Sequence, residues 1–298
     1  MPASGIAIVT PSFARDFALC RELNQSVLEF APPEVRHYLL VDACDLPLFR
    51  QLESARTIVA AIEDVIPRDV RRLPYSRRWW FSRRAAIPLK GWLVQQLVKL
   101  AAVDVVAEPV TVNVDSDVFF VRPFETSLFA NAERTRLYRL PGGVVAGMPH
   151  VKWNRNVARL LRVAPDTLPH ADYVGNVISW DRELVRAARR RVEDVCGTAW
   201  HVAYARARLV GEQVLYGLHA EKVLGFANAP LWLDERSWCH TYWGPGPLAP
   251  EGIDAFVAAL PDDDVAASIA GYSETSHEAR RTASERLRQR ARERTAAH

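Results

Sequence analysis

The sequence predicts an α/β fold, a single domain in which a Rossmann-like, mostly parallel central sheet is flanked by helices. Short apolar segments alternate with segments of helical periodicity in the N-terminal part of the chain, which is typical of parallel sheets. The 298 residues are 49% hydrophobic and 24% charged, so the chain can bury a sizeable core and is not globally disordered.

The first unit of the fold is predicted as a strand, a helix and two further strands. The apolar run Gly5–Thr10 stops at Pro11 and Ser12, which predicts a buried strand and a turn. Apolar residues then recur at helical spacing from Asp16 to Phe30, and proline ends this helix. The other elements predicted here are strands at Val35–Val41 and Thr57–Ile62 and a short helix at Leu48–Leu52.

Residues 67–88 interrupt the alternation, and regular elements resume after them. Their prolines and the arginine- and tryptophan-rich segment 77–84 predict a loop. The elements predicted beyond it are helices at Gly91–Val103, Arg182–Cys196 and Glu212–Ala220, strands at Val110–Val114, Leu137–Leu140 and Val174–Trp180, and a strand and loop at Trp232–Trp243.

The composition argues against nucleic-acid binding and against membrane insertion. The net charge is only +3, and the basic residues form no continuous stripe. No apolar run approaches the ~20 residues of a membrane span, and we see no secretory signal. The four cysteines form no C-x-x-C pair or zinc pattern and are expected to be reduced and mostly buried, so we expect a cytoplasmic protein.

Two acids, Asp115 and Asp117, directly follow the predicted strand Val110–Val114. Residues two apart share one side of an extended backbone, so the carboxylates repel each other unless a proton or a cation lies between them. Mg²⁺ or Mn²⁺ bridging to phosphate oxygens fits such a pair, at the end of a strand where open α/β sheets bind ligands. The alternative is a polar turn in which an Asp caps the next segment.

Several segments resemble the GT-A glycosyltransferases and, more narrowly, bacterial GT-A-like proteins of mostly unassigned specificity. The resemblance covers about residues 5–245, except 125–170. Its more specific parts are D-S-D-V-F-F-V-R-P-F at Asp115–Phe124 and G-W-L-V-Q-Q-L-V-K-L at Gly91–Leu100. The shorter matches are T-P-S at Thr10–Ser12, G-E-Q-V-L-Y-G at Gly211–Gly217 and H-T-Y-W-G-P at His240–Pro245.

The resemblance implies a GT-A-like fold whose two halves have different ligands. Residues 1–124 would form the nucleotide-sugar-binding half and 125–272 the acceptor-binding half. Residues 273–298 are almost entirely polar and would form a charged helical or disordered tail.

The resemblance also implies a metal centre. Asp117 would ligate the metal directly, and Asp115 would contact ribose or sugar hydroxyls, or the metal through water. His240 would be a third ligand, which favours Mn²⁺ somewhat over Mg²⁺. Alternatively, His240 packs between neighbouring aromatic residues.

Residues near the donor nucleotide follow from the same resemblance. Thr10, Pro11 and Ser12 would meet the nucleobase and ribose, or they simply form a turn at a strand end. Gln95 and Lys99, four apart on one helix face, would border the donor diphosphate. The alternative is a solvated polar face, but lysine is rare in this arginine-rich chain, which favours a phosphate contact for Lys99.

Two acids are candidates for the catalytic base that deprotonates the acceptor. Glu212 starts a predicted helix, where the helix dipole alone could account for an acid. Asp172 is the second candidate, or a residue that binds acceptor hydroxyls. If neither is essential, the enzyme would retain anomeric configuration.

The function predicted from these features is metal-dependent hexosyl transfer from a nucleotide-diphosphate sugar. The acceptor would be a carbohydrate, a lipid-linked molecule or a small molecule. Segment 77–84 would be a lid, a peripheral contact with anionic lipid, or a solvated loop with buried aromatic residues.

Two other functions compete with transfer. A haloacid-dehalogenase-like, Mg²⁺-dependent phosphatase also carries two acids at a strand end, and Asp262–Asp264 could serve as its later acidic motif. A non-catalytic, lectin-like sugar-nucleotide-binding protein would keep the fold without turnover.

Overall fold

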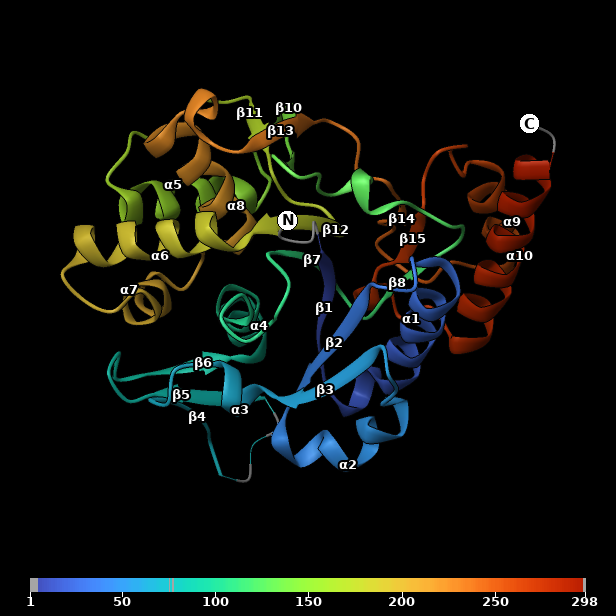
Figure 1. Cartoon of the computed structure of the whole chain (residues 1–298), viewed down its shortest axis with the longest axis horizontal. Helices are drawn as coiled ribbons and strands as arrows, with labels where there is room; N and C mark the ends of the chain where they lie inside the picture. Colours follow the sequence, from blue (N-terminus) through green and yellow to red (C-terminus); the bar gives the residue numbers. More distant parts are fainter. Residues whose placement is uncertain (1–4, 75, 77, 297–298) are drawn as a thin grey trace.

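The computed structural model describes residues 5–74, 76 and 78–296, and its centre is a five-stranded sheet (Figure 1). β1 pairs in parallel with β2 and β7, and β2 with β3, whereas β12 runs antiparallel to β7. The predicted α/β class, with a mostly parallel central sheet flanked by helices, is confirmed. In sheet order the strands are β12 (Val177–Asp181), β7 (Val110–Val114), β1 (Ile6–Ser12), β2 (Arg36–Val41) and β3 (Thr57–Ala61).

Helices α1 (Phe17–Phe30) and α2 (Leu46–Phe49) cover one face of the sheet. Successive residues of β1 point to opposite faces, so Ile6 and Ile8 belong to the cluster that contains α1 residues such as Leu23. The predicted first helix therefore forms where its apolar spacing places it.

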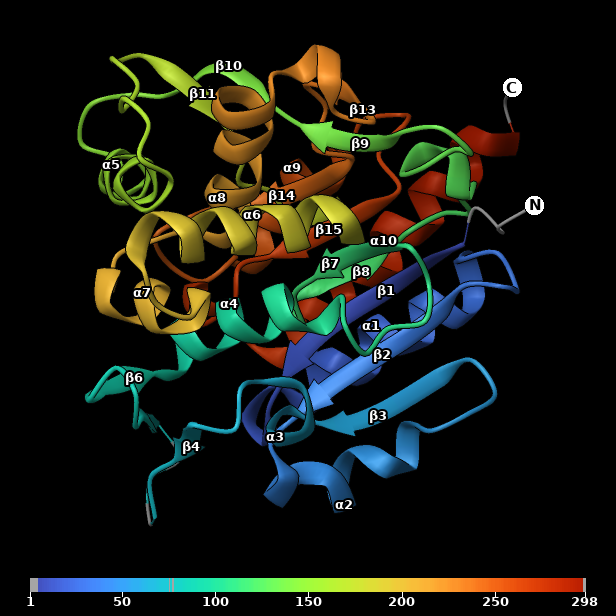
Figure 2. The same ribbon diagram turned by 60° about the vertical axis from the view of Figure 1, so that its left-hand side comes forward.

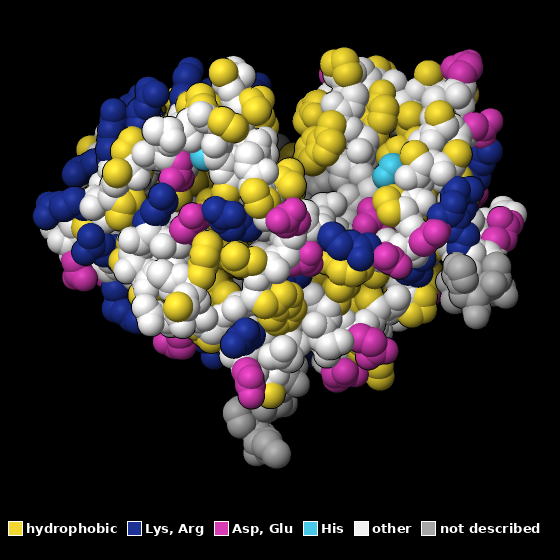
Figure 3. Space-filling view, turned by 90° about the horizontal axis from the view of Figure 1, so that it is seen from above, with side chains coloured by type: hydrophobic (Ala, Val, Ile, Leu, Met, Phe, Trp, Pro, Cys, Tyr) yellow, Lys and Arg dark blue, Asp and Glu magenta, His cyan; other side chains and the backbone are white. Residues whose placement is uncertain are grey.

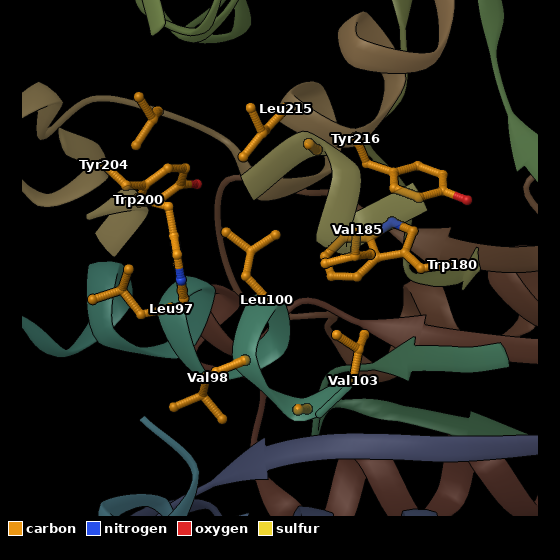
Figure 4. Close-up of a cluster of buried hydrophobic side chains, with 14 of the residues drawn as sticks. Leu97, Val98, Leu100, Val103, Trp180, Val185, Trp200, Tyr204, Leu215 and Tyr216 are labelled. Carbon is orange, nitrogen blue, oxygen red and sulfur yellow. The ribbon is translucent and has the colours of Figure 1, made fainter. Parts of the chain in front are cut away.

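A larger group of helices covers the other face. α4 (Gly91–Ala102) lies centrally, and its apolar side chains belong to the same buried cluster as residues of α6, α7 and α8. Figure 4 shows Leu97 and Leu100 of α4 among Trp200, Trp180 and Leu215. The elements joined to α4 in this way are α6 (Arg182–Cys196), α7 (Trp200–Ala207) and α8 (Glu212–Leu218).

The segment 67–88, expected to be a loop, instead forms most of a small antiparallel sheet. Its strands are β4 (Val70–Arg72), β5 (Trp79–Ser82) and β6 (Ile87–Lys90). The side chains of β5 alternate, with Trp79 exposed and Trp80 buried, which is a strand pattern that the arginines around it obscured. Arg77, the first residue of the predicted segment 77–84, lies outside the described residues.

The charged C-terminal segment forms a helix, α10 (His277–Ala296), which is one of the two states expected for it, and one face of this helix is buried. Ala283, Leu287 and Ala291, spaced by four, are fully buried with residues of α9 (Pro250–Ala258). Both helices pack on a sheet in the order β14 (Cys239–Tyr242), β15 (Ala266–Ile269) and β8 (Val118–Phe120). Residues 297 and 298 of the predicted tail lie outside the described range.

The remaining elements lie on the α4 side of the central sheet (Figure 2). Residues 174–176, predicted as strand, form a loop because Gln213 exchanges two hydrogen bonds with the backbone of Gly175. These elements are α3 (Ile62–Val65), β9 (Thr135–Tyr138), β10 (Leu140–Val144), α5 (His150–Leu161), β11 (His170–Asp172) and β13 (Leu231–Asp234).

All four cysteines are unpaired, as expected. Cys20 and Cys239 are buried, whereas Cys44 and Cys196 are exposed. Half of the cysteines are therefore buried, although most were expected to be. Across the described ranges, no helix combines the length and apolar character that crossing a bilayer requires.

Candidate functional site

Two adjoining cavities lie where strands of the central sheet end. The strand-end cavity has a volume of about 660 Å³ and borders the residues that follow β1, β2 and β3. The acid cavity has a volume of about 700 Å³ and borders the residues that follow β7. Trp92 and Gln95 of α4 line both cavities. Carboxyl ends of parallel strands are where open α/β sheets bind ligands, so both cavities are candidate sites.

The acid pair Asp115 and Asp117 lines the acid cavity. The Asp115 side chain is 52% exposed, whereas Asp117 is more enclosed and its Oδ2 accepts the backbone N–H of Gly271 at 2.6 Å. Burial, followed by the negative charge of Asp115, raises the pKa of Asp117 to about 6. The ionised form of Asp117 is therefore disfavoured in its enclosed position beside Asp115.

A hydrogen bond connects the turn that carries Asp115 and Asp117 to β1. Ser116 Oγ donates a hydrogen bond to Ser12 Oγ over 2.9 Å, and both residues are buried. Ser12 also lines the strand-end cavity. This contact fixes the end of β7 relative to the end of β1, and so fixes one cavity relative to the other.

Lys99 joins two acids that are far apart in the sequence. Its Nζ lies 2.8 Å from Oδ1 of Asp115 and 3.3 Å from Oε1 of Glu212. Burial by itself lowers the pKa of Lys99, but the two carboxylates outweigh it and raise the pKa above its ordinary value. Lys99 is therefore a fixed positive charge at the wall of the acid cavity.

Only part of the predicted nucleotide segment faces a cavity. Ser12 lines the strand-end cavity, whereas Pro11 is buried and the Thr10 hydroxyl lies 3.0 Å from Nε2 of buried His37. Nδ1 of His37 lies 3.0 Å from Asn24, so this polar row belongs to the contact between the sheet and α1. Thr10 and Pro11 are thus placed in the core, away from the lining of either cavity.

The structure does not bring His240 to the acid pair. Its Nε2 lies 2.8 Å from the carbonyl oxygen of Phe256, and its ring stacks on Phe256 with centroids 4.3 Å apart. His240 is not among the residues that line the acid cavity. In this arrangement it packs against Phe256 of α9, an aromatic residue outside the segment that surrounds His240 in the sequence.

The two candidate bases both line the acid cavity but have different partners. Glu212, at the first turn of α8, is held by Lys99 and its side chain is only 9% exposed. Asp172, at the end of β11, accepts from the backbone of Val174 and lies 3.0 Å from Nδ1 of His150. Asp172 is therefore coupled to a second titratable group, and Glu212 to a lysine.

Sequence reasoning missed the acids of the strand-end cavity. Asp42 directly follows β2 and lies 3.1 Å from Arg72, while Oδ2 of Asp45 accepts the backbone N–H of Ala14 at 2.8 Å. Ligand atoms of Asp42, Cys44 and Asp45 lie within 4.8 Å of one another, but the Arg72 guanidinium already provides positive charge there. The position of an acid directly after an apolar strand was the signal for this group, as it was for Asp115.

Aromatic side chains from several segments line the acid cavity. Trp92 and Trp153 stand together on one wall, and the most exposed aromatic residues, Trp243 and Tyr272, belong to the C-terminal part of the chain. Figure 3 shows a cleft between two lobes with hydrophobic side chains on its walls. The acid cavity thus combines charged side chains, such as Lys99, Asp115 and Glu212, with aromatic ones, a combination typical of small-molecule sites.

The fold and sequence have the following counterparts among known proteins. A crystal structure of the galactosyltransferase LgtC with donor and acceptor sugar analogues has a TM-score of 0.45 and 12% identity, covering 96% of this chain and 95% of that chain. An active-site mutant of LgtC has a TM-score of 0.45 and 11% identity, covering 94% of both chains. No curated protein matches the sequence. A family model described as a family of unknown function matches residues 5–232, so the chain belongs to that family, DUF6492.

Proposed function

We propose that the protein is a glycosyltransferase that moves a hexose from a nucleoside-diphosphate sugar to an acceptor hydroxyl. The observation that carries the proposal is the position of Lys99, whose amine lies between Asp115 and Glu212 in a cavity at the carboxyl end of a parallel sheet. A buried cation beside one acid at a strand end and one at a helix start suits a ligand with several negative charges that itself brings a metal ion.

The acid pair fits a divalent cation. Asp115 is half exposed to the cavity, and the pKa of Asp117 is raised to about 6 because burial and the charge of Asp115 disfavour its ionised form. A cation held by these two residues would relieve both effects. Mn²⁺ or Mg²⁺, when bound, would neutralise charge on the departing diphosphate.

The two cavities suit the two ends of a nucleotide sugar. The strand-end cavity has an aromatic side, with Trp79 and Trp80, and a polar side, with Ser12, Asp42 and Asp45. We assign the nucleoside to this cavity and the diphosphate and sugar to the acid cavity. Gln95 borders both and would lie near the junction of nucleoside and diphosphate.

The chain's own residues then have distinct tasks in transfer. Lys99 offsets charge that develops on the leaving diphosphate oxygen, and Glu212 holds Lys99 in place. Ser12 fixes the acid-bearing turn through Ser116. The aromatic walls limit water around the sugar, which favours transfer over hydrolysis.

The segment 77–84 is better suited to bordering the ligand than to binding a membrane. Trp80 is buried, and Trp79 and Trp80 both line the strand-end cavity. We therefore favour a wall or lid. The acceptor classes remain carbohydrate, lipid-linked and small-molecule, and the unpaired cysteines suit a reducing, cytoplasmic location.

The competing phosphatase function has less support. Asp262 and Asp263 form ion pairs with Arg294 and Arg236, and neither acid lines the acid cavity. They are therefore poorly placed to act with Asp115 on one phosphate. Binding without turnover is the other alternative, and it differs from transfer in a simple assay.

The test is to incubate the protein with UDP-, GDP- and ADP-sugars, with Mn²⁺ or with EDTA, and to measure nucleoside diphosphate by chromatography. We expect Mn²⁺-dependent release with one donor and loss of release in Asp117→Asn, but not in the matched variant Asp263→Asn. Release of inorganic phosphate from a phosphomonoester would favour the phosphatase. A donor that raises the melting temperature without release would favour a binding protein.

A further inference from the structure

We propose that His150 is the general base that takes the proton from the acceptor hydroxyl, that Asp172 positions it, and that the acceptor is a saccharide packed against Trp153 and Trp92. The proposal rests on the proposed glycosyl transfer and specifies the acceptor half of the same site. Its basis is a continuous set of contacts that joins these four side chains in the acid cavity.

Asp172 fixes the protonation pattern of His150. Oδ1 of Asp172 accepts the backbone N–H of Val174 at 3.0 Å, which orients the carboxylate, and Oδ2 lies 3.0 Å from Nδ1 of His150. A carboxylate accepts hydrogen bonds, so Nδ1 carries the proton and Nε2 carries the lone pair. Among the described residues Nε2 has no hydrogen-bond partner. The imidazole is thus in the form that can accept a proton.

The aromatic neighbours hold the imidazole ring in position. His150, the first residue of α5, stacks on Trp153 with ring centroids 4.6 Å apart and planes 24° apart. The ring centroids of Trp153 and of Trp92 in α4 lie 5.6 Å apart. Gly211 lies beneath Trp153, where an added Cβ would come within 3.1 Å of its ring. The base is therefore held by a carboxylate at one edge and by stacking on one face.

The same aromatic side chains define the class of acceptor. Trp92 is 43% exposed, so much of its surface is open to a ligand, and it lines the acid cavity together with Trp153. The C–H face of a pyranose packs well on an aromatic ring, while its hydroxyls remain free for polar partners. A saccharide on this surface would place a hydroxyl near His150, because His150 is stacked on the same tryptophan.

Glu212 is less suited to the role of base. Its side chain is 9% exposed, and Oε1 lies 3.3 Å from Lys99, which also holds Asp115. Proton transfer to Glu212 would remove one of the two charges that hold Lys99 beside the diphosphate site. Glu212 therefore acts as a positioning residue for Lys99.

The proposed step is a displacement at the anomeric carbon of the donor sugar, assisted by a general base. The acceptor O–H proton moves to Nε2 of His150 while the acceptor oxygen forms a bond to the anomeric carbon. The bond between that carbon and the phosphate oxygen breaks, and its electron pair leaves with the nucleoside diphosphate. Asp172 stabilises the imidazolium that forms. Attack from the face opposite the leaving group inverts the anomeric configuration.

The first test measures saccharide binding and needs no turnover. Methyl pyranosides of glucose, galactose and mannose are titrated into the full chain while tryptophan fluorescence is recorded. We expect one of them to change the emission, and we expect Trp153→Ala to weaken its binding at least tenfold, whereas Trp232→Ala, a tryptophan outside the cavity, leaves binding unchanged. Equal binding in Trp153→Ala, or no binding of any pyranoside, overturns the saccharide assignment.

The second test measures the base with the donor that the wild type uses, Mn²⁺ and the pyranoside found above. His150→Gln should lower kcat by about 10²–10⁴ and abolish the fall in kcat/KM at low pH. Added imidazole should restore part of the rate to His150→Ala. The matched control is His201→Gln, because His201 forms a similar pair with Asp69 outside the acid cavity.

The other titratable groups that line this cavity are Lys99, Asp115, Asp117, Glu212, Tyr138 and Tyr272. Because any of them could affect the pH dependence of kcat/KM, the variant Asp172→Asn is needed to assign the fall at low pH to His150. The Asp172→Asn variant should shift the pH at which kcat/KM falls and should lower kcat by about 10–100-fold, as expected when a partner that orients a histidine is lost. A wild-type kcat in His150→Gln, or an unchanged pH dependence of kcat/KM in Asp172→Asn, overturns the assignment of His150 as the base. No release of nucleoside diphosphate by the wild type overturns the proposed transfer and the base role together, while the fluorescence result stands by itself.

Discussion

Nζ of Lys99 lies 2.8 Å from Oδ1 of Asp115, so a lysine in the middle of a helix supplies the counter-charge for an acid at a strand end. The same amine contacts Glu212, and both Lys99 and Glu212 are buried. Removing the lysine would leave the buried carboxylate without its partner. If the acid pair holds a metal ion as proposed, Lys99 would stabilise the fold and at the same time compete with the metal for Asp115.

Lys99→Met should lower the free energy of unfolding by about 3 kcal/mol in EDTA, the low end for a broken buried pair because Asp115 is half exposed. It should also tighten Mn²⁺ binding, since Asp115 loses its competing cation, while turnover falls. Urea unfolding and Mn²⁺ calorimetry measure the two effects. The control Lys222→Met breaks the more exposed pair with Asp166 and should cost no more than about 1 kcal/mol. Weaker Mn²⁺ binding in Lys99→Met would count against this account.

Asp117→Asn should stabilise the metal-free protein at neutral pH. The folded pKa of Asp117 is about 6, above its ordinary value, so the folded state holds its proton more tightly and loses stability as pH rises from about 4 to about 6. Asn removes this loss, roughly 3 kcal/mol at pH 7. Melting temperatures in EDTA at pH 5 and 7.5 show the effect, with Asp263→Asn as control. With Mn²⁺ and UDP the order should reverse, and an unchanged order would contradict a metal at Asp117.

His37 should make the protein sensitive to acid. Burial lowers its folded pKa to about 3, so below about pH 6.5 the unfolded state binds a proton that the folded state does not. Stability from this group is complete above pH 6.5 and is lost toward pH 3, at about 1.4 kcal/mol per pH unit. Urea unfolding between pH 4 and 7 should show a shallower dependence for His37→Gln than for the wild type. Parallel curves would mean that His37 is protonated in the fold.

Gly211→Ala should disturb the wall of the acid cavity more than it disturbs the fold. The new Cβ would lie 3.1 Å from the Trp153 ring, so the ring must shift. We expect a loss of stability of about 1–2 kcal/mol and a clear change in tryptophan emission. Gly246→Ala is the matched control, because a Cβ there meets nothing within 4 Å. Crystal or NMR coordinates with an unmoved Trp153 would refute the expectation.

Leu287→Ala should destabilise the protein although it lies in the most charged part of the sequence. Leu287 is fully buried against α9, and such truncations cost about 2–5 kcal/mol. Leu209→Ala, at a leucine that is 49% exposed, should change stability by less than about 0.5 kcal/mol. Equal unfolding midpoints for the two variants would mean that α10 is not packed as described.

Local periodicity was sufficient to predict the elements of the central sheet. Residues 17–30 carry one apolar stripe, and β1, β2 and β7 are rich in apolar residues and almost entirely buried, because helices cover both faces of the central sheet. Asp115 and Asp117 could be found because they directly follow such a strand. Lys99 could be proposed because it is one of few lysines and lies on a helix before that strand.

Features that depend on tertiary contacts were beyond the sequence. His150 pairs with an acid 22 positions away, which spacing alone does not indicate. Its stacking on Trp153, three residues further on, depends on helix α5, which was not predicted. The buried apolar residues of α10 are two alanines and one leucine, which is too small a signal among so many charges. His240 lies in an aromatic segment that matched a metal-binding pattern, but α9 supplies Phe256 to cover it.

Trp92 and Gln95 line both cavities, so a ligand in one cavity can contact side chains that also line the other. A ligand that orders these two side chains from one side prepares, or obstructs, the surface that a second ligand meets. Under the proposed assignment the donor occupies both cavities and the acceptor packs on Trp92, so donor and acceptor would contact the same turn of α4. Their affinities would then be coupled, and the coupling would be reciprocal.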